Sequence, residues 1–386
     1  MPGSRPVVGI DVTAAVTQGG GIGRYTRELV QALLAGDDGN SYRLFSARPP
    51  ADLPVPDPLP HGPRVDLRTA PLSDRWLYRL WHRLRLPLPV ELFTGRLDLF
   101  HSPDFVLPPV RSGTPTLLTV HDLSFVHYPE TFTPALVSYL NRAVPDSVAR
   151  AAHILADSEA TRRDLEAVWN VPPGKITVLY SGVHERFQPV TEGKRLRRVR
   201  EKYALGDAPY VLSVSTIQPR KNYQMLVRAF RPIAERFPHR LVIAGGKGWL
   251  VEEVLAEVGR QGLEERVQFA GFVADADLPA LYSGAALFAF PSLYEGFGLP
   301  LLEAMACGVP VLSSNASSLP EVTGDAAILL APQDEAAWTT ALTRLLEQPQ
   351  ERARLVAAGF RQARRFSWKR AAEQLRALYR QMLGRG

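Results

Sequence analysis

The chain has 386 residues, which is too long for one hydrophobic core and favours two domains. Hydrophobic residues make up 46% of it and charged residues 22%, which is typical of a soluble globular protein, and no run of about 18 uncharged apolar residues indicates a membrane span. The formal net charge of +6 favours an anionic partner, and the single cysteine, Cys307, excludes an internal disulfide and fits a reducing cytoplasm.

Strand-like and helical patterns alternate through the first half of the chain. Residues 1–12 lack the apolar core of a signal peptide and run directly into the first strand-like segment. Helical patterns follow several of these segments, one closed by Gly36 and another capped by Ser158. The alternation predicts parallel βαβ units, and therefore an α/β domain with a doubly wound sheet. The expected strands are residues 7–11, 43–47, 97–102, 116–122, 153–158 and 176–182.

A glycine-rich loop follows the first expected strand. It runs from Gly19 to Gly21, with one more glycine at Gly23. This spacing differs from the dinucleotide-binding fingerprint, so the pattern alone predicts only a flexible turn between a strand and a helix. Two histidines, His101 and His121, stand at the ends of later strands, and a lone histidine in such a place can be either structural or catalytic.

Two basic segments carry arginines at helical spacing. Residues 75–85 contain four arginines together with Trp76 and Trp81, and residues 194–202 form the clearest basic run. A solvated helical face explains both segments, but the first also fits a helix that lies on an anionic membrane surface. Peripheral membrane contact through these two segments is therefore an open expectation.

The alternation of strands and helices starts again after a polar, arginine-rich stretch near residue 190. Ligands of doubly wound sheets bind outside the carboxyl ends of the strands, so the loops there are candidate sites. Arg220 and Lys221 follow one such strand, where they could clamp a diphosphate. A compact ammonium group suits a phosphate oxygen in a tight site. The expected strands are residues 210–215, 240–246, 266–272, 285–292 and 309–314.

Two glutamates, Glu295 and Glu303, bracket a Gly-Phe-Gly turn after another expected strand. The backbone N–H groups of Phe297, Gly298 and Leu299 would form an anion-binding helix N-terminus. Two acids beside an anion site make sense if they accept hydrogen bonds from hydroxyls. A sugar nucleotide offers both kinds of group, since hydroxyls flank its diphosphate. Cys307, in the same helix, is expected to be a small packed residue.

Residues 291–315, PSLYEGFGLPLLEAMACGVPVLSSN, closely resemble the donor-site motif of retaining glycosyltransferases of family 4. The resemblance spans nearly the whole chain. It implies an α/β, GT-B fold, with two doubly wound Rossmann-like domains facing across a cleft and a C-terminal helix that crosses back to the first domain. The implied domains are residues 1–188 on the acceptor side, residues 189–366 for the nucleotide sugar, and the crossover helix 367–386.

The resemblance also implies roles for single residues. Glu295 would contact the transferred sugar, Glu303 would bind the ribose hydroxyls, and Lys221 would bind phosphate. Arg220 would serve as the second cation, because Ser215 stands where many members of the family carry arginine. The catalytic set is therefore His121, which would reach the donor sugar, with Glu295, Lys221 and Arg220. The other implied donor-binding residues are Gly20, Gly21, Ser215, Gly246, Phe272, Val273, Phe297, Gly298, Leu299 and Glu303.

The implied activity is the transfer of a hexose, with retention, from a nucleotide-diphosphate sugar to a saccharide or lipid-linked acceptor in cell-surface glycan synthesis. Mannose from GDP-mannose is the first expectation for the donor. No cofactor is expected, and no metal, because no His/Asp cluster with metal-ligand spacing is present. The alternatives are a UDP- or dTDP-sugar donor, a phosphorylase or epimerase of the same fold, and a catalytically silent scaffold at the membrane. A nucleic-acid partner is not expected. The expected location is the cytoplasm or the inner face of the membrane.

Overall fold

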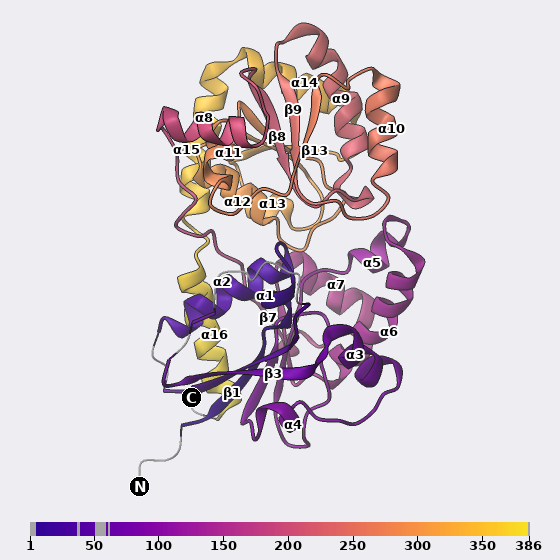
Figure 1. The fold of residues 1–386 in the computed structure, drawn as a ribbon, viewed down its shortest axis with the longest axis vertical. Helices are drawn as coiled ribbons and strands as arrows, with labels where there is room; N and C mark the ends of the chain where they lie inside the picture. Colours follow the sequence, from indigo (N-terminus) through magenta and orange to yellow (C-terminus); the bar gives the residue numbers. More distant parts are fainter. Residues whose placement is uncertain (1–4, 37–38, 51–58, 61, 385–386) are drawn as a thin grey trace. The chain divides into compact units, whose positions relative to one another are not determined.

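A computed structural model describes residues 5–36, 39–50, 59–60 and 62–384 (Figure 1). The chain divides into two compact units. Unit 1 consists of Met1–Leu123, Ser138–Gly182 and Trp368–Gly386, and unit 2 consists of Ser124–Val137 and Val183–Ser367. Each unit has its own sheet and is described by itself below.

Unit 1 contains a seven-stranded sheet in the order β3-β2-β1-β4-β5-β6-β7, in which neighbouring strands pair in parallel. The edge strand β3 was missed in the sequence because its side chains are mostly exposed and lack the apolar run of a central strand. The strands are β1 Val7–Asp11, β2 Ser41–Arg48, β3 Val65–Ser73, β4 Leu99–Ser102, β5 Thr116–Val120, β6 His153–Ala156 and β7 Ile176–Val178.

The helices of unit 1 include the C-terminal helix of the chain. Nη1 of Arg376, in this last helix, donates to the carbonyl of Leu33 at the end of α2, at 3.1 Å. Tyr379 in the same helix bonds to Nδ1 of His101 at 2.7 Å, and Thr119 bonds to Nε2, which makes His101 a structural histidine. The helices are α1 Thr13–Thr17, α2 Ile22–Leu34, α3 Asp74–Tyr78 with the π-helical turn η1 Arg79–Arg83, α4 Glu91–Thr94, α6 Pro134–Arg150, α7 Glu159–Trp169, η3 Pro173–Lys175 and α16 Trp368–Met382.

Unit 2 contains a six-stranded parallel sheet in the order β10-β9-β8-β11-β12-β13. The edge strand β13 was also missed, because it is only partly buried. The strands are β8 Tyr210–Val214, β9 Arg240–Ala244, β10 Val267–Gly271, β11 Leu287–Phe290, β12 Val311–Ser314 and β13 Ala327–Leu330.

Helices pack against this second sheet over two large groups of buried apolar residues. Alternate residues of the central strands belong to different groups, as expected for strands buried on both faces. The helices of unit 2 are α5 Ser124–His127, η2 Pro129–Thr131, α8 Gly193–Lys202, η4 Pro219–Lys221, α9 Tyr223–Arg236, α10 Glu252–Gln261, α11 Leu278–Ser283, α12 Leu299–Ala306, α13 Leu319–Thr323, α14 Glu335–Glu347 and α15 Pro349–Ala363.

The boundaries of the units differ from those expected from the sequence. The division falls after residue 182 and not after 188, because Phe187 and Val190 pack into the unit 2 core. The arginine-rich segment 194–202 forms helix α8, as its helical spacing indicated, and Val199 of this helix is buried in the same core. The segment Ser124–Val137 belongs to unit 2, although it lies within the first half of the sequence.

Within the described residues, none of the helices combines the length and the apolar character that crossing a membrane requires.

Candidate functional site

Strands β8 and β11 are neighbours in the unit 2 sheet. Because they run in parallel, the loops that follow them start at the same edge, where ligands bind in sheets of this kind. The loop after β8 leads into η4, which contains Arg220 and Lys221. The loop after β11 contains Glu295 and leads into α12, which contains Glu303. The topology therefore brings the predicted cations close to the first predicted glutamate.

Asn222 fixes the turn that presents Arg220 and Lys221. Its backbone is left-handed, with φ of 57°, a conformation that asparagine tolerates better than most residues. Its Nδ2 donates to the carbonyl oxygens of Pro291 at 3.1 Å and Pro332 at 2.6 Å. These bonds tie the end of η4 to the segments that follow β11 and β13. Sequence analysis missed this role, for which the asparagine before a helix was the available signal.

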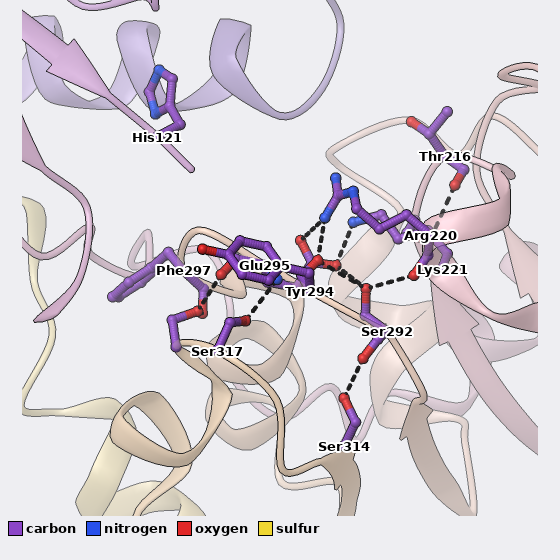
Figure 2. A network of polar contacts seen from close by, with 12 residues as sticks. His121, Thr216, Arg220, Lys221, Ser292, Tyr294, Glu295, Phe297, Ser314 and Ser317 are labelled. Atoms are coloured by element: carbon purple, nitrogen blue, oxygen red, sulfur yellow. Dashed lines mark hydrogen bonds and ion pairs between the residues drawn. The ribbon is translucent and has the colours of Figure 1, made fainter. Parts of the chain in front are cut away.

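Glu295 stands at the centre of a buried polar network (Figure 2). Its carboxylate accepts hydrogen bonds from Lys221 Nζ, from Arg220 Nη1 at 3.1 Å and from Ser292 Oγ at 2.6 Å. Burial alone would raise the pKa of Glu295, but the two cations and the hydrogen bonds outweigh it and hold the pKa at about 2. Glu295 is therefore ionised at neutral pH. Two cations and one carboxylate leave the network with a net positive charge, which suits an anionic ligand.

Serines that follow β12 hold the backbone on both sides of Glu295 (Figure 2). Ser317 Oγ accepts a hydrogen bond from the Glu295 N–H at 2.7 Å. Ser318 Oγ donates to the carbonyl oxygens of Glu295 and Phe297, both at 2.9 Å. These hydrogen bonds within the protein therefore fix the shape of the loop. The sequence analysis missed these serines, although the run SSNASS after a strand was visible.

Gly298 precedes helix α12 with φ of 109°, which strongly favours glycine. A Cβ at this position would lie 2.8 Å from Leu319 Cδ2, so the turn also requires a residue without a side chain. Pro300 occupies the first turn of α12, as expected. The Phe297 side chain is buried against Phe366, with ring centroids 5.7 Å apart. Only the backbone of residues 297–299 is therefore available for the predicted anion contact, which stays a prediction.

Glu303 lies in the interior of α12 and is 2% exposed. The hydroxyl of Tyr282, a residue that sequence analysis missed, donates to its Oε2 at 2.8 Å. This bond fixes the orientation of the carboxylate. The predicted contact of Glu303 with ribose stays a prediction. Cys307 is buried, and burial, together with the nearby Glu303, raises the pKa of its thiol to about 12, which confirms a packed residue.

The remaining predicted donor contacts of unit 2 have different surroundings. The Ser215 hydroxyl bonds to the Tyr223 hydroxyl at 2.6 Å, which anchors the end of the loop after β8. A Cβ on Gly246 would meet no atom within 4 Å, so the backbone there is open to a ligand. Phe272 is 63% exposed, whereas Val273 is buried in the core and offers only its backbone. Their contact with the base stays a prediction.

The segment Ser124–Val137 packs against the Glu295 loop within unit 2. The His127 ring stacks on Tyr294, with centroids 5.3 Å apart and an interplanar angle of 26°. Trp249 Nε1 donates to the carbonyl of Thr131 at 2.7 Å and fixes the other end of the segment. Sequence analysis missed these contacts, because nothing in a local pattern reveals a partner more than 100 residues away.

In unit 1, His121 follows strand β5 and is buried. Its Nδ1 bonds to Asp157 Oδ2 at 2.7 Å, and its Nε2 lies 3.2 Å from the Pro103 carbonyl. A carbonyl can only accept, so Nε2 carries a proton in this arrangement. Burial lowers the pKa of His121, but the Asp157 carboxylate and these hydrogen bonds outweigh it and raise the pKa to about 9. The predicted contact with the donor sugar stays a prediction.

The Arg27 side chain holds the start of the glycine-rich loop of unit 1 through backbone carbonyl groups. The Arg27 guanidinium donates to the carbonyl oxygens of Ala15 at 2.8 Å and Gln18 at 2.7 Å, and also reaches Gly19 at 3.2 Å. Gly21 has φ of 50° and precedes α2. A Cβ on either Gly20 or Gly21 would meet no atom within 4 Å. The loop is therefore pinned at its base and open at the two predicted contact positions, whose role stays a prediction.

A small cavity of about 70 Å³ opens in unit 1 beside α1 and α3. The carboxylates of Asp11 and Asp104 line it, together with the rings of Tyr78, His82 and Tyr139. Burial raises the pKa of Asp11 to about 7, against the effect of its hydrogen bonds with Thr13. Sequence analysis missed this cavity, because its lining comes from elements far apart in the chain.

Comparisons with known proteins agree with this geometry. The family model described as Glycosyltransferase Family 4 matches residues 19–187, and the one described as Glycosyl transferases group 1 matches residues 197–362. The O-antigen chain mannosyltransferase B of Escherichia coli is 33% identical over 365 residues, covering 92% of this chain and 94% of that protein.

Two further proteins are similar over most of the chain. A D-inositol 3-phosphate glycosyltransferase of Salinispora tropica is 31% identical over 308 residues, which cover 74% of this chain and 64% of that protein. The structure of sucrose-phosphate synthase from Thermosynechococcus elongatus superposes with a TM-score of 0.76 at 23% identity, covering 99% of this chain and 100% of that one. This last likeness concerns the fold alone. The chain therefore belongs to glycosyltransferase family 4, as a hexosyltransferase with the GT-B fold that resembles the mannosyltransferases.

Proposed function

We propose that this enzyme transfers mannose from GDP-mannose to a saccharide hydroxyl during synthesis of a cell-surface glycan. The observation that carries the proposal is the buried network in which Lys221 and Arg220 share Glu295, at the carboxyl ends of β8 and β11. The name and extent of the O-antigen mannosyltransferase relative support mannose as the sugar.

The main barrier to transfer is the charge that develops on the diphosphate as the bond from the sugar C1 breaks. Lys221 and Arg220 are held in place by Glu295 and by the Asn222 side chain, so their charges need no reorganisation during the reaction. Fixed charges in a buried site stabilise such a transition state strongly. The new bond forms between C1 and the acceptor oxygen on the face that the diphosphate leaves, and the acceptor proton passes to a phosphate oxygen. Configuration at C1 is then retained.

Glu295 acts as a positioning group in this proposal. Its pKa of about 2 keeps it ionised, so it accepts hydrogen bonds from sugar hydroxyls and does not donate a proton at neutral pH. Its charge also lies between two cations, which lowers its nucleophilicity. A covalent intermediate on Glu295 is therefore not part of the proposal.

The proposed reaction needs no divalent metal. In the described part of the chain, the side chains of His, Cys, Asp and Glu do not gather in any group of three or more that could hold a metal ion. The two buried cations would supply the positive charge that a metal provides in other transferases. We therefore propose that turnover is insensitive to EDTA.

The small acidic cavity of unit 1 is the proposed site for an acceptor sugar. Carboxylates such as Asp104 accept hydrogen bonds from sugar hydroxyls, and aromatic rings pack against the apolar face of a sugar ring. Tyr78 and Tyr139 meet edge to face, with centroids 4.5 Å apart, and so form a firm wall. Replacing Asp104 with Asn should raise the KM for the acceptor while leaving the KM for GDP-mannose unchanged.

Residues 75–85 are the proposed contact with the membrane that presents a lipid-linked acceptor. Trp76 is 53% exposed and Leu84 is 61% exposed among exposed arginines. The other expected contact, residues 194–202, forms helix α8, whose apolar Val199 points into the core. None of the large hydrophobic residues that the structure describes as exposed lies in that helix. The proposal therefore places peripheral contact on residues 75–85 alone.

The experiment that tests the donor is nucleotide diphosphate release from a panel of GDP-, UDP- and dTDP-sugars, with and without EDTA. The proposal expects GDP release from GDP-mannose, unchanged by EDTA and lost in Glu303→Ala. Release from a UDP- or dTDP-sugar alone would replace mannose and GDP as the donor. Loss of release in EDTA, restored by Mg²⁺, would contradict metal independence.

A further inference from the structure

A second cavity of unit 1, here called the arginine groove, shares the side chains of Trp81 and His82 with the acidic cavity. Its volume is about 260 Å³. Its charge is opposite to that of its neighbour, because guanidinium groups outnumber the carboxylate in its lining. The charged side chains that line it are Arg85, Arg142, Arg150 and Asp146.

Arg150 is the structural member of this set. Its Nε donates to Asp146 Oδ2 at 3.0 Å, which neutralises the carboxylate of the groove. Its Nη2 donates to the Leu107 carbonyl at 2.5 Å, and its Nη1 lies 3.4 Å from the Pro108 carbonyl. Arg150 therefore helps to build the groove and is committed to protein partners.

Arg85 and Arg142 are the exposed members of the set. The side chain of neither makes a hydrogen bond or an ion pair to any other residue that the structure describes. Arg85 has φ of 53°, a left-handed backbone that is uncommon for a residue other than glycine or asparagine. Two guanidinium groups without a protein carboxylate line one concave surface, and guanidinium groups bind phosphate through paired N–H donors.

Leu86 lines the arginine groove, and two further leucines, Leu84 and Leu88, lie close to it in the chain; the three are here called the leucine rim. Leu84 is 61% exposed, Leu86 is 38% exposed and Leu88 is 37% exposed, all in the segment that carries Arg85. The Trp81 indole donates to the Leu88 carbonyl at 2.8 Å and holds this segment against the groove. Cations in a groove with leucines at its edge match a ligand that combines a phosphate with an apolar chain.

We propose that the arginine groove binds the headgroup phosphate of an anionic phospholipid in the membrane surface, with Arg85 and Arg142 on the phosphate and the leucine rim against the acyl region. This inference rests on the proposed contact of residues 75–85 with a membrane and names the lipid group that the contact recognises. The groove then orients unit 1 on the membrane, in addition to the non-specific attraction of its other arginines.

The test measures partition of the full chain onto phosphatidylcholine vesicles with and without phosphatidylglycerol. Each basic residue near an anionic surface strengthens binding about fivefold, so the double variant R85Q/R142Q should bind the anionic vesicles about thirtyfold more weakly than the wild type. The matched control is R354Q/R380Q, which removes the same charge from exposed positions on α15 and α16 and should stay within about twofold of the wild type. GDP release from GDP-mannose without vesicles should be equal in all three proteins.

Several results would overturn the inference. Equal weakening in the two double variants would mean that net charge, and not the groove, governs binding. Undiminished binding of R85Q/R142Q would contradict lipid binding by the groove but not the membrane contact of residues 75–85. Failure of the wild type to bind anionic vesicles would contradict both proposals. Inorganic phosphate that displaces the wild type from vesicles at low concentration would identify a soluble phosphate site. Leu86→Ser should weaken vesicle binding with both arginines in place, and no effect of it would contradict the role of the rim.

Discussion

Glu295 in unit 2 and Asp11 in unit 1 are both buried carboxylates, but their pKa values are shifted in opposite directions. Glu295 lies between Lys221 and Arg220, and its pKa falls to about 2. Among the described residues that line the acidic cavity there is no lysine or arginine beside Asp11, and burial raises its pKa to about 7, with Asp104 adding to the effect. The first carboxylate is fully charged at neutral pH, and the second is balanced between its charged and neutral forms.

This difference in charge matches the two tasks of a glycosyltransferase, which are to bind the donor diphosphate and to bind the acceptor hydroxyls. A cation-paired carboxylate can hold cations for a diphosphate while staying charged itself, whereas a carboxylate without a cation is suited to neutral hydroxyls. Removing a charge should therefore be harmful at Glu295 and mild or favourable at Asp11. The following predictions use that contrast, from the largest effect to the smallest.

Lys221→Ala should have the largest effect on activity. The variant removes one of the two cations that face the developing charge, and loss of one such group lowers kcat by about 100- to 1,000-fold. Steady-state GDP release from GDP-mannose measures the change. Lys369→Ala, an exposed lysine on α16, is the matched control and should retain full activity. Activity of Lys221→Ala within tenfold of the wild type would contradict the proposed role of the cation pair.

Glu295→Gln should lower both activity and stability. The change leaves two buried cations without their carboxylate, and breaking a buried ion pair destabilises by about 3–5 kcal/mol. The pKa of Glu295 is depressed below its ordinary value of 4.5, so its contribution is complete above pH 4.5 and is lost as the pH falls towards 2. Urea unfolding at neutral pH measures the loss, with the exposed Glu130→Gln as control. Equal stability of the variant and the wild type would show that the ion pairs contribute nothing net.

Tyr282→Phe should have an intermediate effect on donor binding. It removes the hydrogen bond that orients Glu303, and a hydrogen bond to a charged group contributes about 1.5–3 kcal/mol. If Glu303 binds ribose, the KM for GDP-mannose should rise about tenfold with little change in kcat. Tyr203→Phe, in the same unit, serves as a control for the loss of a hydroxyl. A loss of stability without a change in KM would assign Tyr282 a structural role only.

Asp11→Asn should have the smallest effect on GDP release, and its effect on stability should be opposite in sign to that of Glu295→Gln. Because the folded pKa of Asp11 is raised from 3.8 to about 7, ionisation destabilises the fold increasingly as pH rises through this window. The variant removes that penalty, so its stability relative to the wild type should be higher at pH 8 than below pH 4, by up to about 4 kcal/mol for a pKa shift of about three units. Thermal unfolding at the two pH values measures the gain. A gain that is equal at both pH values would show that the titration of Asp11 is not its cause.

The central strands and the donor motif could be predicted from the sequence because their signals are local. The apolar runs of β8 and β11, the turn at Gly298 and the Pro300 that starts α12 each depend on a few neighbouring residues. The edge strand β3 was missed because exposed side chains carry little apolar pattern. Helix α8 was predicted as a solvated helical face, and its packing into the core was missed because its single buried residue, Val199, lies among arginines.

The supporting residues of the site could not be predicted, because their partners are distant in sequence. Tyr282 meets Glu303, and His127 stacks on Tyr294, through tertiary contacts that no local pattern records. Lys221 and Arg220 were predicted as phosphate ligands from the family motif, and their shared carboxylate, Glu295, emerged only in the structure. Resemblance therefore identified the groups that would meet the substrate, and the structure identified what holds them.

The most direct test of the cation-paired site is the affinity for GDP, measured by calorimetry in buffer containing EDTA. The account predicts that the wild type and Asp11→Asn bind GDP equally well, while Lys221→Ala binds it at least tenfold more weakly, in line with the loss of a charge-assisted hydrogen bond to phosphate. Unchanged affinity in Lys221→Ala, or an equal loss in both variants, would contradict the assignment of diphosphate binding to the Lys221–Glu295–Arg220 network.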